Sequence, residues 1–204
     1  MSDQARLLFK GILDPVAAYL NRIGLTPNTV TLIGLFGHIL AALAAARGSM
    51  LTAALFIIFL GPVDALDGTM ARLRGEATRW GGFVDSVVDR YSELFIFGGL
   101  MVFFLEEQNT AGALLSYLAA SGSIMVSYIR ARAQAVGIDV KDGWFSRMER
   151  YMVLVPALIF NFPFAGVAII AAGAHFTAVQ RIFVLRSRVH RMGEDGLQSA
   201  KARE

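Results

Sequence analysis

The sequence predicts an all-α integral membrane protein, in which six transmembrane helices follow an N-terminal amphipathic helix lying in the membrane interface. The first observation behind this prediction is composition: 55% of the 204 residues are hydrophobic, only 17% are charged, and the mean hydropathy is +0.55. A soluble domain of this size does not need so much apolar sequence. The other observations are a series of long apolar segments and the concentration of lysine and arginine at every second break between these segments. The absence of cysteine excludes disulfide bonds and thiolate metal sites.

The first segment, residues 1–24, is predicted to be the interfacial helix. Apolar side chains such as Leu13 and Leu20 recur at helical spacing among basic ones. This pattern is typical of a helix that lies along the membrane surface. The chain then breaks, and Thr26 is expected to cap the next helix with Pro27 at its first position.

The membrane domain, residues 25–192, is predicted to contain the six spans. A span needs about 20 mainly apolar residues. The approximate segments are Asn28–Ala46, Met50–Leu73, Gly81–Leu105, Thr110–Val136, Glu149–Phe162 and Pro163–Arg186. The fifth segment is shorter than a full span and contains Pro156. The tail, residues 193–204, is polar, and we expect it to lack a fixed structure.

Lysine and arginine concentrate at alternate breaks between these segments. They occupy the N-terminal helix, the second break, the fourth break with its flanks, and the C-terminal end of the last segment. After the N-terminal helix these residues are Arg72, Arg74 and Arg79, then Arg130, Arg132, Lys141, Arg147 and Arg150, and finally Arg181, Arg186, Arg188 and Arg191. The intervening breaks carry only Arg47 among basic residues, together with two glutamates after the third segment. The positive-inside rule then places both termini and the basic breaks in the cytoplasm. The sequence therefore predicts a multi-pass protein of the cell membrane.

Four aspartates stand at helical spacing inside this apolar sequence. They belong to the run Asp64-x2-Asp67-Gly68-x2-Ala71-Arg72-x8-Gly81-x3-Asp85-x3-Asp89. A carboxylate near lipid is costly unless it is paired or bound to a metal ion. Each pair shares one face of a helix, and the two helices are expected to run antiparallel around a short cytoplasmic turn. All four carboxylates would then lie at a similar depth, near the cytoplasmic face.

The chemistry of this run favours divalent cations and a nucleotide. Carboxylates without histidine or cysteine suit Mg²⁺ or Mn²⁺. Four of them exceed the need of one ion and indicate two, the arrangement that clamps a transferring phosphoryl group. The small residues Gly68 and Ala71 would let a nucleotide approach the helix, where Arg72 can reach a phosphate and Thr78 a base or phosphate.

Two alternatives remain for the aspartates. They could form a buried ion-pair network with Arg72, Arg79 and Arg90. They could also bind the cargo of a divalent-cation transporter, although transport sites usually lie near mid-bilayer at broken helices. These acids instead stand beside a predicted cytoplasmic turn.

The complete run resembles the signature of the CDP-alcohol phosphotransferase family, with eight fixed positions filled across 26 residues. Six spans behind an amphipathic helix are similar to that family as well. The resemblance implies an enzyme that moves a phosphoryl-linked group from a CDP-activated donor to an alcohol and releases CMP. It also implies a homodimer, and nothing in the sequence points to a nucleic-acid partner.

The resemblance assigns roles to individual positions. Asp64, Asp67 and Asp85 are expected to bind metal, while Asp89 accepts the proton of the attacking alcohol and can also contact the second ion. The implied cofactor is a pair of Mg²⁺ ions, with Mn²⁺ as an alternative. The implied contacts to the CDP donor are Asn28, Thr29, Val30, Thr31, Gly68, Ala71, Arg72 and Thr78.

Two other segments resemble the subgroup that makes phosphatidylinositol phosphate or its archaeal ether-lipid counterpart. They are Ser127–Ala133, ending the fourth span, and Arg147–Arg150, beginning the fifth. Arg130, Arg150 and Arg181 match basic positions of that subgroup, and three such cations would bind a phosphate on the acceptor. The resemblance thus implies CDP-diacylglycerol as donor, myo-inositol 1-phosphate as acceptor, and phosphatidylinositol phosphate and CMP as products.

This subgroup assignment leaves alternatives open. Arg130 replaces a lysine common in bacterial members, and Ser146 stands where a glutamate is expected. The acceptor could instead be glycerol 3-phosphate, or the donor could be CDP-inositol. The arginines could also be anchors for lipid headgroups. We expect His38 and His175, which lie within apolar segments, to form interhelical hydrogen bonds and not to act in catalysis.

Overall fold

A computed structural model describes residues 3–61, 63–75, 78–140 and 142–201 of the chain. The secondary structure of these residues is α-helical, without strands, which confirms the all-α prediction. In chain order the helices are α1 (Asp3–Arg22), α2 (Pro27–Ala46), α3 (Met50–Leu60), α4 (Val63–Arg74), α5 (Arg79–Glu106), α6 (Thr110–Ala135), α7 (Arg147–Ile159) and α8 (Pro163–Lys201).

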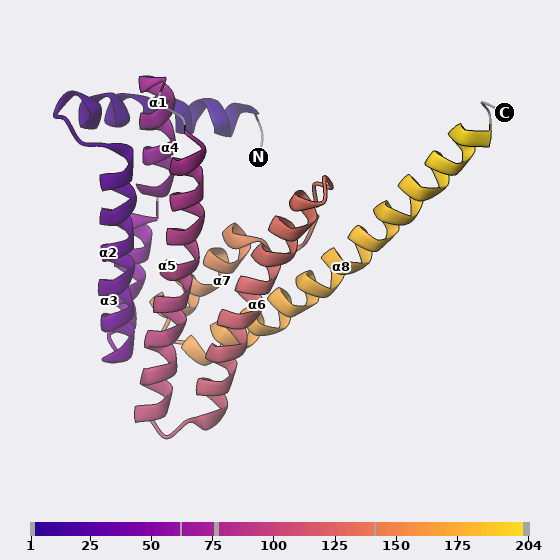
Figure 1. Ribbon diagram of the computed structural model, residues 1–204. Helices are drawn as coiled ribbons and strands as arrows, with labels where there is room; N and C mark the ends of the chain where they lie inside the picture. Colours follow the sequence, from indigo (N-terminus) through magenta and orange to yellow (C-terminus); the bar gives the residue numbers. More distant parts are fainter. Residues whose placement is uncertain (1–2, 62, 76–77, 141, 202–204) are drawn as a thin grey trace.

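Helix α1 runs across one end of the upright helices α2, α4 and α5 (Figure 1). Ala17 on α1 is fully buried against Val30 and Met70, which fixes α1 onto the start of α2 and onto α4. Arg74 at the end of α4 donates to the side chain of Asn21 and to the carbonyl of Leu25, each at 2.7 Å. The N-terminal helix is thus attached directly to the helix that carries the first half of the aspartate motif.

The predicted start of the first span is confirmed. Thr26 is the N-cap of α2, where its hydroxyl accepts from the amide of Thr29 at 3.2 Å, and Pro27 occupies the first turn. Further along, α2 packs on α5 so closely that a Cβ added to Gly99 would collide with the backbone carbonyl of Ala42. A glycine on α5 therefore allows the backbones of these two helices to approach each other.

The prediction of one continuous span over Met50–Leu73 is wrong. The chain forms two helices there, because α3 ends at Leu60 and α4 begins at Val63. Pro62 lies between them, and a proline has no amide hydrogen with which to continue the helical ladder. The break separates the apolar α3 from α4, which carries Asp64 and Asp67.

Helices α6, α7 and α8 form the second part of the bundle. Helix α6 packs against α5 and α8, and α7 packs against α3 and α8. The largest apolar cluster joins the two parts, with Leu100 of α5, Leu158 of α7 and Ile170 of α8 fully buried within it. The prediction that residues 193–204 lack structure is wrong for the part described, because α8 continues to Lys201. This stretch contains no proline, and several of its residues are strong helix formers.

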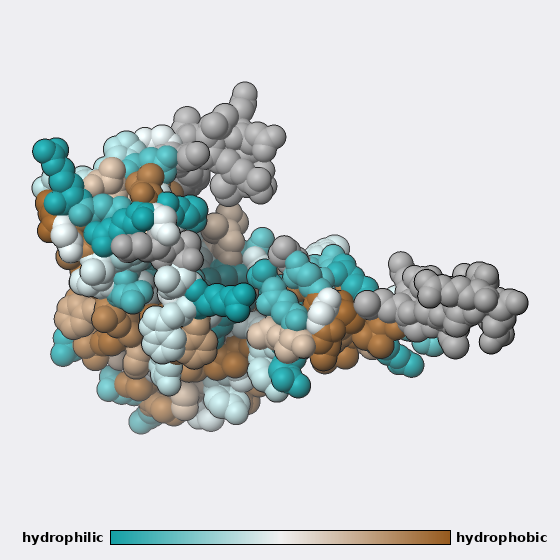
Figure 2. Space-filling view, turned by 45° about the horizontal axis from the view of Figure 1, so that its top comes forward, coloured by the Kyte–Doolittle hydropathy of each residue, from teal (hydrophilic) through white to brown (hydrophobic). Residues whose placement is uncertain are grey.

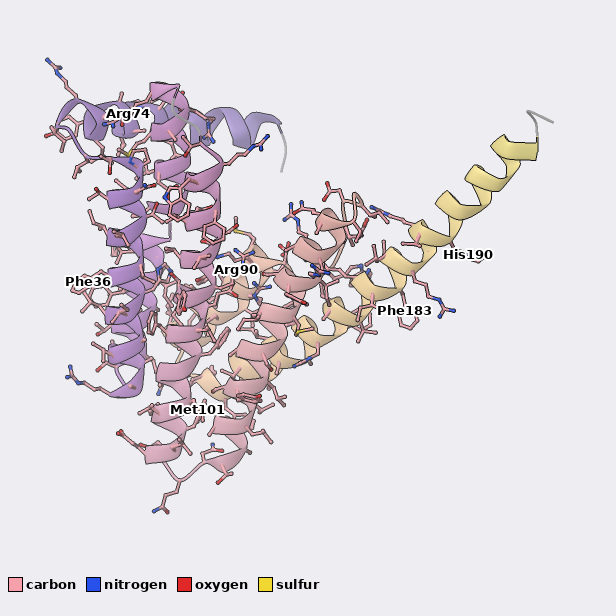
Figure 3. All side chains as sticks on the ribbon, viewed as in Figure 1. Phe36, Arg74, Arg90, Met101, Phe183 and His190 are labelled. Carbon is pink, nitrogen blue, oxygen red and sulfur yellow. The ribbon has the colours of Figure 1, made fainter. Side chains whose placement is uncertain are left out.

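The helices have the length and surface of a membrane protein. By length and apolar composition, α2, α6 and Pro163–His190 of α8 can cross a bilayer, and α3 is a shorter apolar helix. Large aromatic side chains face outward, as Phe36 on α2 (61% exposed) and Phe183 on α8 (62% exposed) do in Figure 3. Hydrophilic residues gather at the end where α1 lies and in the recess toward α8 (Figure 2). The protein is a multi-pass membrane protein.

Candidate active site

A cavity of about 180 Å³ lies where α5, α6, α7 and α8 meet. Its wall includes Asp89 from α5, Arg130 from α6, Arg150 from α7 and Arg181 from α8. Its other lining residues are Arg90, Glu93, Val126, Ser127, Ser146 and Arg147. The structure thus brings together the predicted catalytic base and all three predicted acceptor arginines, which come from four different helices. Arg90 is visible in Figure 3 between α5 and the α6–α8 half of the molecule.

The carboxylate of Asp89 is held by two guanidinium groups. Its Oδ1 accepts from Nη1 of Arg147, across the space between α5 and α7. Its Oδ2 lies 3.4 Å from Nη1 of the neighbouring Arg90. The carboxylate lies at the cavity wall with little exposure, its side chain being 16% exposed.

Glu93 lies one turn after Asp89 on α5 and is almost completely buried. Its Oε1 accepts from Nη2 of Arg150 at 2.6 Å and lies 3.8 Å from Nε of Arg147. Arg150 also donates to the carbonyl of Phe145 at 3.2 Å. A buried glutamate therefore compensates the charge of Arg150 and fixes its orientation in the cavity wall.

Arg181 and Arg130 differ in how they are held. Arg181 is buried and donates from Nε to the carbonyl of Asp142 at 2.9 Å and from Nη1 to the carbonyl of Val126 at 2.6 Å. It thereby links α8 to α6 and to the α6–α7 loop. The Nε of Arg130 is buried and makes no hydrogen bond within the described part of the protein. A cation with unused donors at a cavity wall is suited to bind an anion.

The aspartate motif is described only in part. Asp67 on α4 is buried, and its Oδ2 accepts from the hydroxyl of Thr31 at 2.5 Å while its Oδ1 accepts from the amide of Gly68 at 2.5 Å. Asp85 is half-buried on α5. The side chain of Asp64 lies outside the described residues, and the side chains that are described include no group of three histidines or acids arranged to hold one ion.

The predicted contacts to the CDP donor lie mainly around α4 and the first turn of α2. Arg72 donates to the hydroxyl of Thr69 at 2.8 Å, and its guanidinium lies over Gly68, where an added Cβ would be 3.5 Å from Nη1. Thr31 reaches Asp67, whereas Val30 is buried against α1 and α4. The predicted donor contacts with exposed or half-buried surface are Asn28, Thr29, Gly68, Ala71, Arg72 and Thr78.

Thr78 has a structural role that the sequence reasoning did not assign to it. It is the N-cap of α5, and its hydroxyl accepts from the amide of Gly81 at 3.0 Å. A Cβ added to Gly81 would lie 3.3 Å from that hydroxyl, so the glycine leaves room for the cap. The cap fixes the start of the helix that carries Asp85 and Asp89.

Sequence reasoning missed two residues of the cavity wall, Glu93 and Arg147. Glu93 stands four residues after Asp89, so the helical spacing of the acids continues one turn beyond the motif. An ionisable residue in the apolar part of a predicted span was itself a signal. Arg147 belongs to the segment Arg147–Arg150 that resembles the subgroup, but nothing local indicated its contacts with the two acids, because these lie 54 or more residues earlier in the chain.

Comparisons with known proteins agree with this site. A family model described as CDP-alcohol phosphatidyltransferase matches residues 24–180. The phosphatidylinositol phosphate synthase of Mycobacterium tuberculosis is 35% identical over 191 residues, covering 87% of this chain and 87% of that protein. The archaetidylinositol phosphate synthase of Methanothermobacter thermautotrophicus is 32% identical over 195 residues, covering 93% of this chain and 96% of that protein.

Solved structures show the same relationship. The crystal structure of the M. tuberculosis phosphatidylinositol phosphate synthase with CDP-DAG bound superposes with a TM-score of 0.80 at 30% identity, covering 85% of this chain and 93% of that one. A second structure of that synthase, in complex with manganese and citrate, has a TM-score of 0.78 at 29% identity and covers 85% of this chain and 88% of that one. Together with the filled aspartate motif, these matches show that the chain is a phosphatidyltransferase of the CDP-alcohol phosphatidyltransferase family.

Proposed function

We propose that the protein transfers the phosphatidyl group of CDP-diacylglycerol to myo-inositol 1-phosphate, giving phosphatidylinositol phosphate and CMP. The observation that carries this proposal is the cavity that Asp89 shares with Arg130, Arg150 and Arg181. An acceptor with one phosphate and a ring of hydroxyls matches a cavity with a cationic wall and an adjacent base. The names of the relatives in M. tuberculosis and M. thermautotrophicus point to the same acceptor.

The charges of the cavity favour a phosphorylated acceptor over a free alcohol. Five arginines and two carboxylates line it, so its formal charge is positive. Arg150 and Arg181 are held by protein partners through their other nitrogens, and the Nε atoms of Arg130 and Arg150 are buried and make no hydrogen bond in the described part of the protein. A phosphate dianion would complete the hydrogen bonding of these donors through short, charge-assisted contacts.

The donor is proposed to bind on the α4 side of the site. Asn28, Thr29, Val30, Thr31, Gly68, Ala71, Arg72 and Thr78 are the proposed contacts or supports for its CDP group. Thr31 and the amide of Gly68 orient the carboxylate of Asp67. The carboxylate donor set of Asp64, Asp67, Asp85 and Asp89 fits hard divalent ions, and we propose two Mg²⁺, with Mn²⁺ able to replace them. When bound, such ions neutralise the diphosphate and stabilise the departing CMP.

The reaction follows from these positions. The acceptor phosphate binds to the arginines, which brings an inositol hydroxyl to Asp89. Asp89 accepts the proton of that hydroxyl as its oxygen attacks the phosphorus that carries diacylglycerol. The bond from this phosphorus to the CMP oxygen breaks, and CMP leaves with the bonding electrons. Holding both substrates in this geometry removes much of the entropic barrier.

The membrane arrangement is part of the proposal. Residues 1–24 form the interfacial helix, residues 25–192 the catalytic domain with six spans, and residues 193–204 the polar tail. The spans are α2, the α3–α4 pair, α5, α6, α7 and α8. Both termini and the active site face the cytoplasm, and the protein acts as a homodimer. The acyl chains of the donor then remain in the bilayer while its diphosphate reaches the aspartates.

The test is CMP release by the purified protein with CDP-diacylglycerol and a panel of acceptors. The panel contains inositol 1-phosphate, free inositol and glycerol 3-phosphate, with CDP-inositol as an alternative donor. We expect release with inositol 1-phosphate that needs added Mg²⁺ or Mn²⁺ and stops with a chelator. Preference for another acceptor would overturn the substrate assignment. Metal flux into liposomes without CMP release would indicate a transporter.

A further inference from the structure

Arg147 is the first residue of α7. Its guanidinium contacts both acids of the cavity, Asp89 and Glu93. Its Nη1 donates to Asp89 Oδ1, and its Nε lies 3.8 Å from Oε1 of Glu93. Asp89 and Glu93 are one turn apart on α5, so the planar guanidinium lies along two successive turns of that helix. The contact with Asp89 is a hydrogen bond, whereas the contact with Glu93 is an ion pair beyond hydrogen-bonding distance.

The guanidinium is also held from its own helix. Its Cζ lies 5.5 Å from the centre of the Tyr151 ring, one turn further along α7. This distance is within the range of a cation–π interaction. The side chain of Arg147 therefore contacts two acids on α5 and an aromatic ring on its own helix.

Tyr151 is in turn connected to α2. Its hydroxyl lies 3.4 Å from Nε2 of His38, whose Nδ1 lies 2.8 Å from the carbonyl of Gly34. A carbonyl only accepts, so Nδ1 carries the hydrogen and Nε2 of a neutral His38 accepts from the tyrosine. The chain of contacts runs from buried His38 on α2 through Tyr151 and Arg147 to Asp89 on α5. The predicted interhelical hydrogen bond of His38 is part of this chain.

We propose that Arg147 is a positioning residue for Asp89, oriented by Glu93 and by the ring of Tyr151. The inference rests on the proposed function, because it needs Asp89 to take the proton of the acceptor. Arg147 fixes which way the carboxylate of Asp89 faces and does so from another helix. It acts through Asp89, whereas Arg130, Arg150 and Arg181 act on the acceptor phosphate.

Steady-state kinetics of Arg147→Ala and Arg147→Lys test this role, with each substrate varied in turn. A base that is displaced by about 1 Å can lose about a hundredfold in rate. We expect Arg147→Ala to lower kcat about tenfold or more while the acceptor KM changes by less than about threefold. Arg147→Lys keeps a charge near Asp89 and should recover part of kcat. An unchanged KM for CDP-diacylglycerol shows that the variant is folded.

Tyr151 provides a matched pair of variants. Tyr151→Phe keeps the aromatic face and should retain kcat, whereas Tyr151→Leu removes it and should lower kcat in the same direction as Arg147→Ala. Arg47→Ala, at the exposed C-cap of α2 outside the cavity, is the control and should behave as wild type.

Three outcomes would overturn the inference. A rise in acceptor KM at constant kcat would make Arg147 a fourth phosphate ligand. Wild-type kinetics for Arg147→Ala would leave it without a role in turnover, and equal kcat for Tyr151→Phe and Tyr151→Leu would exclude the aromatic support. If instead the wild-type protein does not use inositol 1-phosphate, the proposed function fails and the kcat comparison is made with the acceptor that it uses.

Discussion

At the scale of single residues, Arg130 gives the clearest test of acceptor binding. Its Nε is buried at the cavity and makes no hydrogen bond in the described part of the protein, so a substitution removes a potential ligand contact. A charge-assisted contact contributes about 1.5–3 kcal/mol, and 1.4 kcal/mol corresponds to a factor of ten. Arg130→Ala should therefore raise the apparent KM for inositol 1-phosphate about tenfold or more and leave that for CDP-diacylglycerol unchanged.

Arg150→Ala and Arg181→Ala should raise the same KM, measured by varying each substrate in turn. Arg150→Ala would also leave Glu93 without its closest partner, and Arg181→Ala would release the carbonyls of Asp142 and Val126. Both variants are thus expected to unfold at a lower temperature than Arg130→Ala does. An unchanged acceptor KM in all three variants would mean that these arginines are only anchors at the membrane surface.

Asp89 should be essential for turnover but not for donor binding. Asp89→Asn removes the proton acceptor and at most one ligand of one ion, so we expect CMP release to be lost while CDP-diacylglycerol still binds. Binding is measured as the increase in unfolding temperature that the donor produces. Glu107→Gln, at the opposite end of α5, is a control and should retain full activity. Near-normal turnover of Asp89→Asn would exclude it as the base.

At the scale of helices, the contact of α2 with α5 depends on a single missing side chain. A Cβ at Gly99 would collide with the carbonyl of Ala42, whereas a Cβ at the adjacent Gly98 would have nothing within 4 Å. We expect Gly99→Ala to destabilise the protein by about 1–3 kcal/mol and Gly98→Ala to be close to neutral. Thermal unfolding in detergent measures both. Equal unfolding temperatures for the two variants would contradict this account of the packing.

The helices were largely predictable because their signals are local. Thr26 with Pro27, the apolar segments and the charged breaks each report on a few neighbouring residues, and the structure has helices in those places. Pro62 was also visible in the sequence, but a proline can kink a span as well as divide it. The relation of Arg147 to Asp89 and Glu93 could not be read from the sequence, since it depends on how α7 meets α5. The aspartate pattern itself could be recognised in the sequence. The side chain of Asp64 is not among those that the structure describes.

At the scale of the whole molecule, the proposed topology can be tested without removing native thiols. The chain has no cysteine, so a single introduced cysteine is the only reactive thiol. Glu107 directly follows α5 and Val136 directly follows α6, so the two residues lie at opposite ends of α6. Both are exposed. In intact cells a membrane-impermeant thiol reagent should label Glu107→Cys and should reach Val136→Cys only after the membrane is opened. The reverse pattern would invert the orientation, and labelling of both in intact cells would contradict the six spans.

The short length of α7 has a consequence for how the two substrates reach the site. Its 13 residues extend about 20 Å, less than the hydrocarbon thickness of about 30 Å, whereas the 28 residues of α5 extend about 42 Å. In Figure 1, α7 begins below the level of α1, and this start carries Arg147 and Arg150. Such hydrophobic mismatch is relieved when the bilayer thins beside the short helix. If α7 spans the bilayer as proposed, we expect the water-soluble acceptor to reach the site where the bilayer is locally thinned, while the lipid donor reacts from its own leaflet.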